Sequence, residues 1–83
     1  MTDLKQRMIE FIREKEKCSW EELCMEFALH KDFDAVINNL DHNNIINLIW
    51  NHQRISYDVH FMEFNYLTEI YTKKVIKEAI LIL

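Results

Sequence analysis

Two stretches, Ser19-Trp20-Glu21-Glu22-Leu23-Cys24 and Asn44-Ile45-Ile46, decide the expected fold of this 83-residue chain. In the first, a serine is followed three residues later by a glutamate, a capping box that favours a helix beginning just after Ser19. At the second, the period of the apolar residues changes from about 3.6 to 2, which indicates that helix gives way to strand. We therefore expect a helix-rich first half followed by a hairpin.

Three helices are expected before Asn44. Asp3 with Gln6 forms another capping arrangement, and apolar residues then recur at helical spacing from Leu4 to Ile12. Asp32 is the expected N-cap of the third helix. Asn44 can end that helix because asparagine tolerates the left-handed backbone conformation. In the turn between the second and third helices, Leu29 is expected to point inward.

Alternation of apolar and polar residues over 46–50 and again over 55–59 predicts a two-stranded hairpin. Its connection, 51–54, contains no glycine, and Asn51 is the residue in it that is able to adopt the left-handed conformation. From about residue 61 the helical spacing returns and predicts one long helix to residue 83. The predicted core combines apolar positions from these elements: Phe11, Leu23, Phe27, Val36, Leu40 and Trp50.

The order helix, S-x-x-E-L helix, turn, helix and hairpin, over about residues 4–59, resembles the winged-helix superfamily. The matching positions are Ser19, Leu23, Val36, Ile37, Leu40 and Asn44-Ile45-Ile46. The resemblance implies a single domain over 1–83, mainly α with a small β-hairpin (α+β): a winged helix-turn-helix with a long C-terminal helix. The helix-turn-helix would span about 19–44, the wing about 46–59 and the last helix about 61–83.

The chain departs from the family pattern in the turn and at the hairpin tip. Ala28 stands in the turn where glycine is common, and the turn is one residue short. The hairpin tip lacks both glycine and a basic cluster. The presumed recognition helix has no arginine or lysine after its first turn, although the resemblance implies that it enters the major groove of DNA.

The helix-turn-helix stretch is acidic where the family usually meets a polyanion. From Cys18 to His52, histidines aside, the only basic side chain is Lys31, against Glu21, Glu22, Glu26, Asp32, Asp34 and Asp41. DNA affinity depends largely on neutralising phosphates, and few could be neutralised by this surface. Any DNA binding would be weak, or would depend on dimerisation and on cations elsewhere: Lys5, Arg7, Lys73, Lys74 and Lys77.

Two functions follow from this conflict. The first is a small DNA-binding regulator of transcription, in which Asn38 or Asn39 pairs with adenine. Lys31, His52 and Arg54 would then contact phosphates. The alternative is an acidic protein-interaction module (an adaptor, inhibitor or DNA mimic) that binds a basic protein surface and no DNA. The residues assigned to this binding face are Lys31, Asp34, Asn38, Asn39, Asp41, His42, His52 and Arg54.

Nothing in the sequence predicts an enzyme, a cofactor or a metal site. Glycine is absent, which excludes the glycine-dependent loops that cradle phosphates. Cys18 and Cys24 form no CxxC pair, and the spacing of the four histidines matches no compact ligand pattern. Two cysteines without a signal peptide, and no apolar run long enough for a membrane span, favour a reducing cytoplasmic setting.

The last helix carries more apolar surface than one small core needs. Its main stripe consists of Phe64, Leu67 or Thr68, Tyr71, Val75 and Ala79. We expect either a helix wrapped across its own domain or, preferably, a homodimer formed through this helix. The residues assigned to dimerisation lie on the other faces of the helix: Tyr66, Ile70, Ile80 and Leu81.

Overall fold

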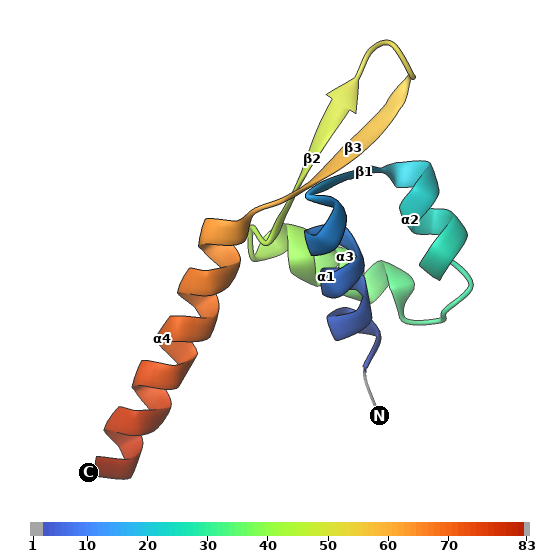
Figure 1. Ribbon diagram of the computed structural model, residues 1–83. Helices are drawn as coiled ribbons and strands as arrows, with labels where there is room; N and C mark the ends of the chain where they lie inside the picture. The colour runs from blue at the N-terminus through green and yellow to red at the C-terminus, as the bar shows by residue number, and fades with distance from the viewer. Residues whose placement is uncertain (1–2, 83) are drawn as a thin grey trace.

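The computed structural model describes residues 3–82, with side chains placed for residues 3–77. Its elements in chain order are α1 (Leu4–Lys15), β1 (Lys17–Ser19), α2 (Trp20–Phe27), α3 (Phe33–His42), β2 (Ile46–Asn51), β3 (Ser56–Phe61) and α4 (Glu63–Ile82). The fold is mainly helical with one small antiparallel sheet (Figure 1), which confirms the predicted α+β class.

The sheet has three strands in the order β1-β3-β2. The predicted hairpin is present, with Ile46 opposite Phe61 and Asn51 opposite Ser56. β1 was not predicted: it is three residues long and lies antiparallel to β3, with Lys17 opposite His60. Such a short segment carries no periodic signal of its own, and its extended form depends on pairing with a strand about 40 residues away.

Side-chain caps fix the starts of the first two helices, as the sequence indicates. The Gln6 backbone N–H donates to Asp3 Oδ1 over 2.7 Å. The Glu22 N–H donates to Ser19 Oγ over 3.1 Å, and the Glu22 carboxylate accepts from the Ser19 N–H, so the capping box is complete. Asp32 stands at the N-cap of α3, but its side chain makes no capping hydrogen bond.

The end of α3 is fixed by Asn44, as expected. Asn44 has φ 59°, and its N–H donates to the Asp41 carbonyl over 3.1 Å. The next N–H, of Ile45, donates back to the Leu40 carbonyl over 2.9 Å, which completes a Schellman motif without glycine. This cap turns the chain from α3 directly into β2.

The hairpin connection differs from the prediction. Its positive φ, 53°, falls on Ile55 and not on Asn51. Asn51 instead closes the turn with its side chain, whose Oδ1 accepts the backbone N–H groups of Gln53 and Arg54 at 2.9 and 3.1 Å. Asparagine often closes a turn in this way, because its side-chain oxygen takes the place of a backbone carbonyl as the acceptor. A β-branched residue therefore occupies the strained left-handed position.

The helices α1, α2 and α3 pack against the sheet around one apolar core. Among the predicted core residues, Leu23, Phe27 and Leu40 are buried, while Phe11 and Val36 are partly buried against them. The remaining buried residues are Met8, Ile9, Ile12, Cys18, Phe33, Ile37, Ile45, Ile46 and Val59.

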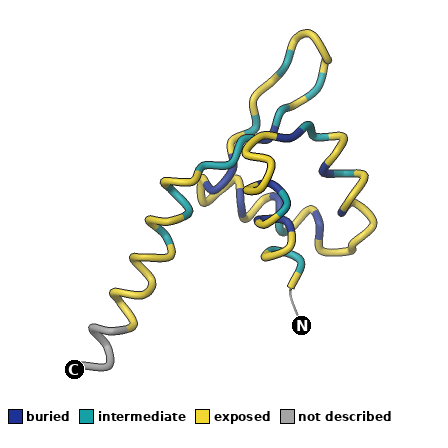
Figure 2. The backbone as a smooth tube through the Cα atoms, viewed as in Figure 1, coloured by how far each residue is buried: buried dark blue, intermediate teal, exposed yellow. Residues whose placement is uncertain are grey.

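Two predicted core positions are wrong. Trp50 is 42% exposed, because the hairpin projects past the helices and its tip lies beyond the core (Figures 1 and 2). The alternation along β2 was correct, but it does not reveal where the core ends. Leu29 is fully exposed in the α2–α3 turn. The aromatic residues on either side of that turn in the sequence, Phe27 and Phe33, are both buried instead.

The long last helix is confirmed as α4, which begins at Glu63 and leaves the domain on the side opposite the hairpin tip (Figure 1). Its start is tied down by side chains. Asn65 Nδ2 donates to the Asn44 carbonyl over 2.9 Å, and Tyr66 packs edge-on against Phe61. Every described residue from 70 to 77 is exposed, so this part of α4 has no cover (Figure 2).

Candidate functional site

The exposed side of α3 brings together three of the predicted site residues. Asp34, Asn38 and Asp41 recur at i, i+4 and i+7, which places them on one side of the helix, and all three are exposed. We call these three residues the acidic stripe. Asn39 and His42 are exposed as well, but they lie on the neighbouring side of the helix.

Helix electrostatics account for one of the two aspartates and not for the other. Asp34 lies in the first turn of α3, where the helix dipole favours a negative charge. Asp41 lies in the last turn, where the same dipole disfavours one. Neither takes part in the ion pairs formed among residues 3–77. Among the residues whose side chains are described, none forms an ion pair that compensates the charge of Asp41.

The predicted cations give this surface little positive charge. Lys31 is exposed in the turn before α3, and His52 is exposed at the hairpin tip. Arg54 also lies at the tip, but its guanidinium pairs with two carboxylates. Nη1 donates to Glu21 Oε2 over 3.2 Å, and Nη2 pairs with Asp58 Oδ1.

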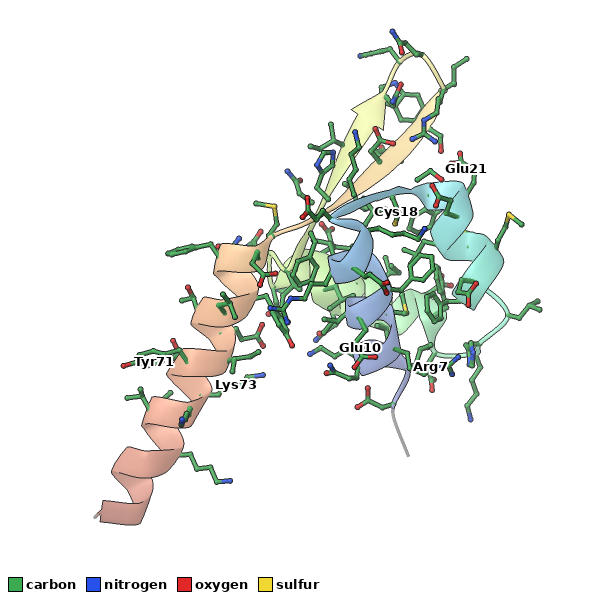
Figure 3. All side chains as sticks on the ribbon, in the orientation of Figure 1. Arg7, Glu10, Cys18, Glu21, Tyr71 and Lys73 are labelled. Atoms are coloured by element: carbon green, nitrogen blue, oxygen red, sulfur yellow. The ribbon has the colours of Figure 1, made fainter. Side chains whose placement is uncertain are left out.

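The Arg54 pairs belong to a network that connects the hairpin to α2. Asn51 Nδ2 donates to Asp58 Oδ2 over 3.0 Å, which orients the carboxylate that holds Arg54. Hydrogen bonding from Ser56 lowers the pKa of Glu21, with its own backbone N–H and the Arg54 charge contributing further. Glu21, labelled in Figure 3, stands at the start of α2. The network therefore fixes the hairpin on α2 and neutralises the arginine expected to contact phosphate.

Several large apolar residues are exposed on α2, in the turn after it and on the hairpin, and sequence reasoning assigned them no binding role. Met25 is 88% exposed on the outer side of α2, one helical turn before the fully exposed Leu29. Glu22 and Glu26 flank them at helical spacing on that outer side. On the hairpin, Ile55 is 77% exposed. The signal that could have identified Met25 is its place opposite the buried stripe of α2.

A hollow of about 550 Å³ continues the acidic stripe beyond the end of α3. It lies between α3, the start of β2 and the first turns of α4. Its polar lining consists of two carboxylates and several carboxamides, together with one hydroxyl: Asp41, Asn43, Asn44, Asn47, Asn65, Thr68 and Glu69. Such a lining offers many hydrogen-bond acceptors. Glu69 already pairs with Lys73 over 2.8 Å, so the negative charge that could attract a cationic side chain comes from Asp41.

The histidines and cysteines form no centre of their own. His52 lies in the hairpin connection while His60 pairs with Lys17 and Asn47, so the two histidines do not face each other. Within the described part of the chain, no three His, Cys, Asp or Glu side chains gather closely enough to hold a metal ion. Cys18 is buried and burial raises its pKa to about 11; burial also raises the pKa of the half-buried Cys24.

The residues predicted to form the dimer differ in their surroundings: one is packed within the domain, one is exposed, and two have side chains outside the described residues. Tyr66 packs within its own domain, against Phe61 and beneath the guanidinium of Arg13, whose Cζ lies 5.2 Å from the tyrosine ring centroid. Ile70 is 45% exposed. Ile80 and Leu81 lie in α4, and their side chains are outside the described residues.

Comparison with protein-family models, with curated protein sequences and with solved structures finds no match to this chain. None of the helices in the described region is both long and apolar enough to cross a membrane.

Proposed function

We propose that this chain is a winged-helix-like domain that serves as a protein-interaction module and binds a basic protein surface, not DNA. The observation that carries the proposal is the position of Arg54. Its guanidinium is held between Glu21 and Asp58, so the predicted wing presents no free arginine beside an acidic α3. This function is the alternative of the two that the sequence leaves open.

The electrostatic argument against DNA rests on the acidic stripe. A helix that enters the major groove passes between two phosphate backbones, and Asp34 and Asp41 would approach them without compensating cations. Asn38 is exposed between them and could still pair with adenine, which is the one observation that favours the DNA-binding regulator. A single amide contact does not offset the missing phosphate contacts, because these supply most of the affinity.

The positive argument for a protein partner rests on the apolar side chains that are exposed on α2, in the following turn and at the hairpin tip. Met25 and Leu29 extend from α2 and the following turn, and exposed Met is typical of surfaces that adapt to partners. Ile55 adds an apolar group at a strained backbone position. Strain of this kind is maintained where it serves a function. An apolar centre with a charged rim is how protein interfaces are built.

The winged-helix part of the proposal is supported by the order of the elements. A short strand stands between α1 and α2, and the hairpin follows α3, which gives the sheet order β1-β3-β2. This is the arrangement expected of helix-turn-helix and wing. The two free thiols, Cys18 and Cys24, support the further proposal of a reducing, cytoplasmic setting.

A binding titration with a basic probe tests the proposed function. The probe is a synthetic peptide of about fourteen residues with leucine at helical spacing and lysine elsewhere. Binding would be followed by the fluorescence of Trp50, which is part-exposed on the hairpin. The combined change Asp34→Lys and Asp41→Lys should weaken binding by about tenfold or more, mainly through slower association.

The matched control is Glu10→Lys with Glu14→Lys, two exposed positions on α1 that change the net charge equally. This control should change the affinity far less than the α3 double variant. Equal losses for the two double variants would show that overall charge, and not the acidic stripe, attracts the peptide. That result would contradict the proposed binding face.

A further inference from the structure

The two edges of the sheet differ in how they are protected. In the order β1-β3-β2, the outer strands are β1 and β2. β1 is three residues long and begins with Lys17, and both shortness and a lysine discourage pairing with another chain. β2 is six residues long, and it contains no charged residue and no proline. Its register with β3 runs without a bulge, so the strand itself carries none of the usual protective features.

The backbone of β2 directs hydrogen-bonding groups away from β3 at every second residue. The Phe61 N–H donates to the Glu16 carbonyl over 2.9 Å, so Phe61 points its backbone groups out of the hairpin on the β1 side. Ile46 lies opposite Phe61, and such outward-facing pairs alternate along an antiparallel hairpin. On the side away from β3, Figure 1 shows no other described element along the half of β2 nearest the tip. Leu48 and Trp50 therefore present their N–H and C=O groups at a free edge.

Large apolar side chains lie along the same edge. Ile49 is 43% exposed and Trp50 is 42% exposed. β1 pairs with β3 only at 58–60, so the part of the hairpin nearest the tip has just two strands. Two-stranded hairpins are only marginally stable in water, and a third strand supplies the missing support. An exposed apolar edge with free N–H and C=O groups is a template for another extended strand.

The sequence of β2 fits a second copy of itself. Because β2 carries no charge, an antiparallel copy meets it without like-charge repulsion along the strand. Hydrogen-bonded pairs must join the outward-facing residues, and this condition is met when Ile49 lies on the two-fold axis. Leu48 of one copy then lies opposite Trp50 of the other, and the two copies of Ile49 lie opposite each other. Each exposed apolar residue of the edge thus covers an apolar residue of the second copy.

The hollow at the end of α3 leaves room for this arrangement. With the axis at Ile49, the hairpin tip of the second copy lies beside the start of β2. The hollow of about 550 Å³ is at this place, lined by Ile46 and Asn47 of β2 and by Asn65 of α4. An axis at Leu48 would also join outward-facing residues, but it would move that tip about 7 Å further toward α4. The room beside β2 therefore favours the axis at Ile49.

We propose that β2 pairs antiparallel with the β2 of a second copy of this chain. The pairing joins the two three-stranded sheets into one sheet across a two-fold axis at Ile49. The sequence predicted a homodimer through the last helix, and this proposal moves the interface to β2, where the backbone groups specify an extended strand as the partner. The inference goes beyond the proposed function and does not depend on it.

The oligomeric state tests the interface. The unmodified chain should sediment as a dimer at micromolar concentration, and Ile49→Lys should give a monomer, since the two lysines would face each other on the axis. Within one copy the new lysine lies opposite Asp58, so the fold should be kept, as circular dichroism would show. The matched control is Met25→Lys, which adds the same charge at an 88% exposed position on α2 and should leave a dimer.

The outcomes of this test also separate the other possible occupants of the edge. A monomeric unmodified chain overturns the proposal and leaves the β2 edge to a strand of another protein. A dimer that survives Ile49→Lys overturns it as well, and loss of that dimer in Tyr71→Glu would place the interface on α4. Amide hydrogen exchange gives a local readout: the Leu48 and Trp50 amides should be protected in the unmodified chain and lose that protection in Ile49→Lys. Unprotected amides in a dimer would contradict the proposal.

Disulfide trapping tests the register, in a background with Cys24→Ala, since the remaining native thiol, Cys18, is buried. Two copies of Ile49→Cys should cross-link, because opposite Cα atoms in such a non-hydrogen-bonded pair lie about 4.5 Å apart. Asn47→Cys should not cross-link to itself, because its two copies lie about 14 Å apart along the strands. Failure of Ile49→Cys to cross-link, or efficient cross-linking of Asn47→Cys, would overturn the assigned antiparallel register.

Discussion

The guanidinium of Arg54, at the hairpin tip, donates a hydrogen bond to the carboxylate of Glu21, at the start of α2, over 3.2 Å. The two residues are 33 positions apart in the sequence, and the bond fixes the hairpin against the helix. It also places a carboxylate against the only arginine of the predicted binding face, which reduces the positive charge that this arginine offers to a ligand. One contact thus bears on both the stability and the partner of this domain.

Loss of the Arg54 pairs should destabilise the domain only slightly. Arg54→Gln is expected to lower the free energy of unfolding by about 1 kcal/mol or less, because ion pairs this exposed contribute little. Urea denaturation measures the change. Lys31→Gln is the control, since Lys31 is exposed and joins none of the ion pairs found among residues 3–77. Equal effects of the two substitutions would count against a structural role for Arg54.

Truncation of a buried leucine and of an exposed leucine should change the stability of the domain to very different extents. Leu40 is completely buried, so Leu40→Ala should lower the free energy of unfolding by about 2–5 kcal/mol. Leu29 is fully exposed, so Leu29→Ala should change it by no more than about 0.5 kcal/mol. Denaturant titrations of both variants measure this. A large loss for Leu29→Ala would mean that the turn packs inward as the sequence first indicated.

Relief of strain at the hairpin tip should stabilise the domain. Ile55 has φ 53°, a conformation that costs a β-branched residue roughly 1–2 kcal/mol. Asparagine tolerates it, and the exposed Ile55 side chain loses little burial, so Ile55→Asn should raise the free energy of unfolding by about 1 kcal/mol. Ile49→Asn, in regular β2, should lower it. Thermal unfolding of the two variants measures these changes. An Ile55→Asn variant less stable than the unmodified chain would show that Ile55 is not strained.

The buried thiol should make stability fall at alkaline pH. Burial, with a contribution from the Glu22 charge, raises the pKa of Cys18 from its ordinary value of 9.0 to about 11. Because the folded pKa is the higher one, the folded state holds the thiol proton more tightly. Its contribution is fully present below pH 9 and is lost between pH 9 and 11, by at most about 3 kcal/mol. Cys18→Ala should lack this part of the pH dependence. Identical slopes of the unfolding free energy against pH for this variant and the unmodified chain would contradict the role of the thiol.

Local signals in the sequence predicted the elements well, because the groups that fix them are close in the chain. The Ser19–Glu22 capping box and the left-handed Asn44 act within a few residues of the helix ends they define. The change of apolar period located the hairpin for the same reason. β1 could not be predicted in this way, because only its pairing with the distant β3 makes it a strand.

The exposure of the acidic stripe was predicted from the sequence, but the contacts around it were not. Helical spacing placed Asp34, Asn38 and Asp41 on the exposed side of α3, where they lie. The pairing of Arg54 with Glu21 depends on how the hairpin bends over α2, which no local pattern contains. Trp50 shows the same limit: the pattern gives the face of a strand, whereas its exposure depends on how far the hairpin extends past the core.

The most direct test of the central claim is the affinity of the chain for mixed-sequence duplex DNA at about 50 mM salt, where even weak electrostatic binders are detected. Fluorescence anisotropy of a labelled duplex would measure it. We predict no binding by the unmodified chain and measurable, salt-sensitive binding after Asp34→Lys with Asp41→Lys, because that change removes the charge that repels phosphates. Clear binding by the unmodified chain, weakened by Asn38→Ala or Arg54→Ala, would contradict the account and restore the DNA-binding regulator.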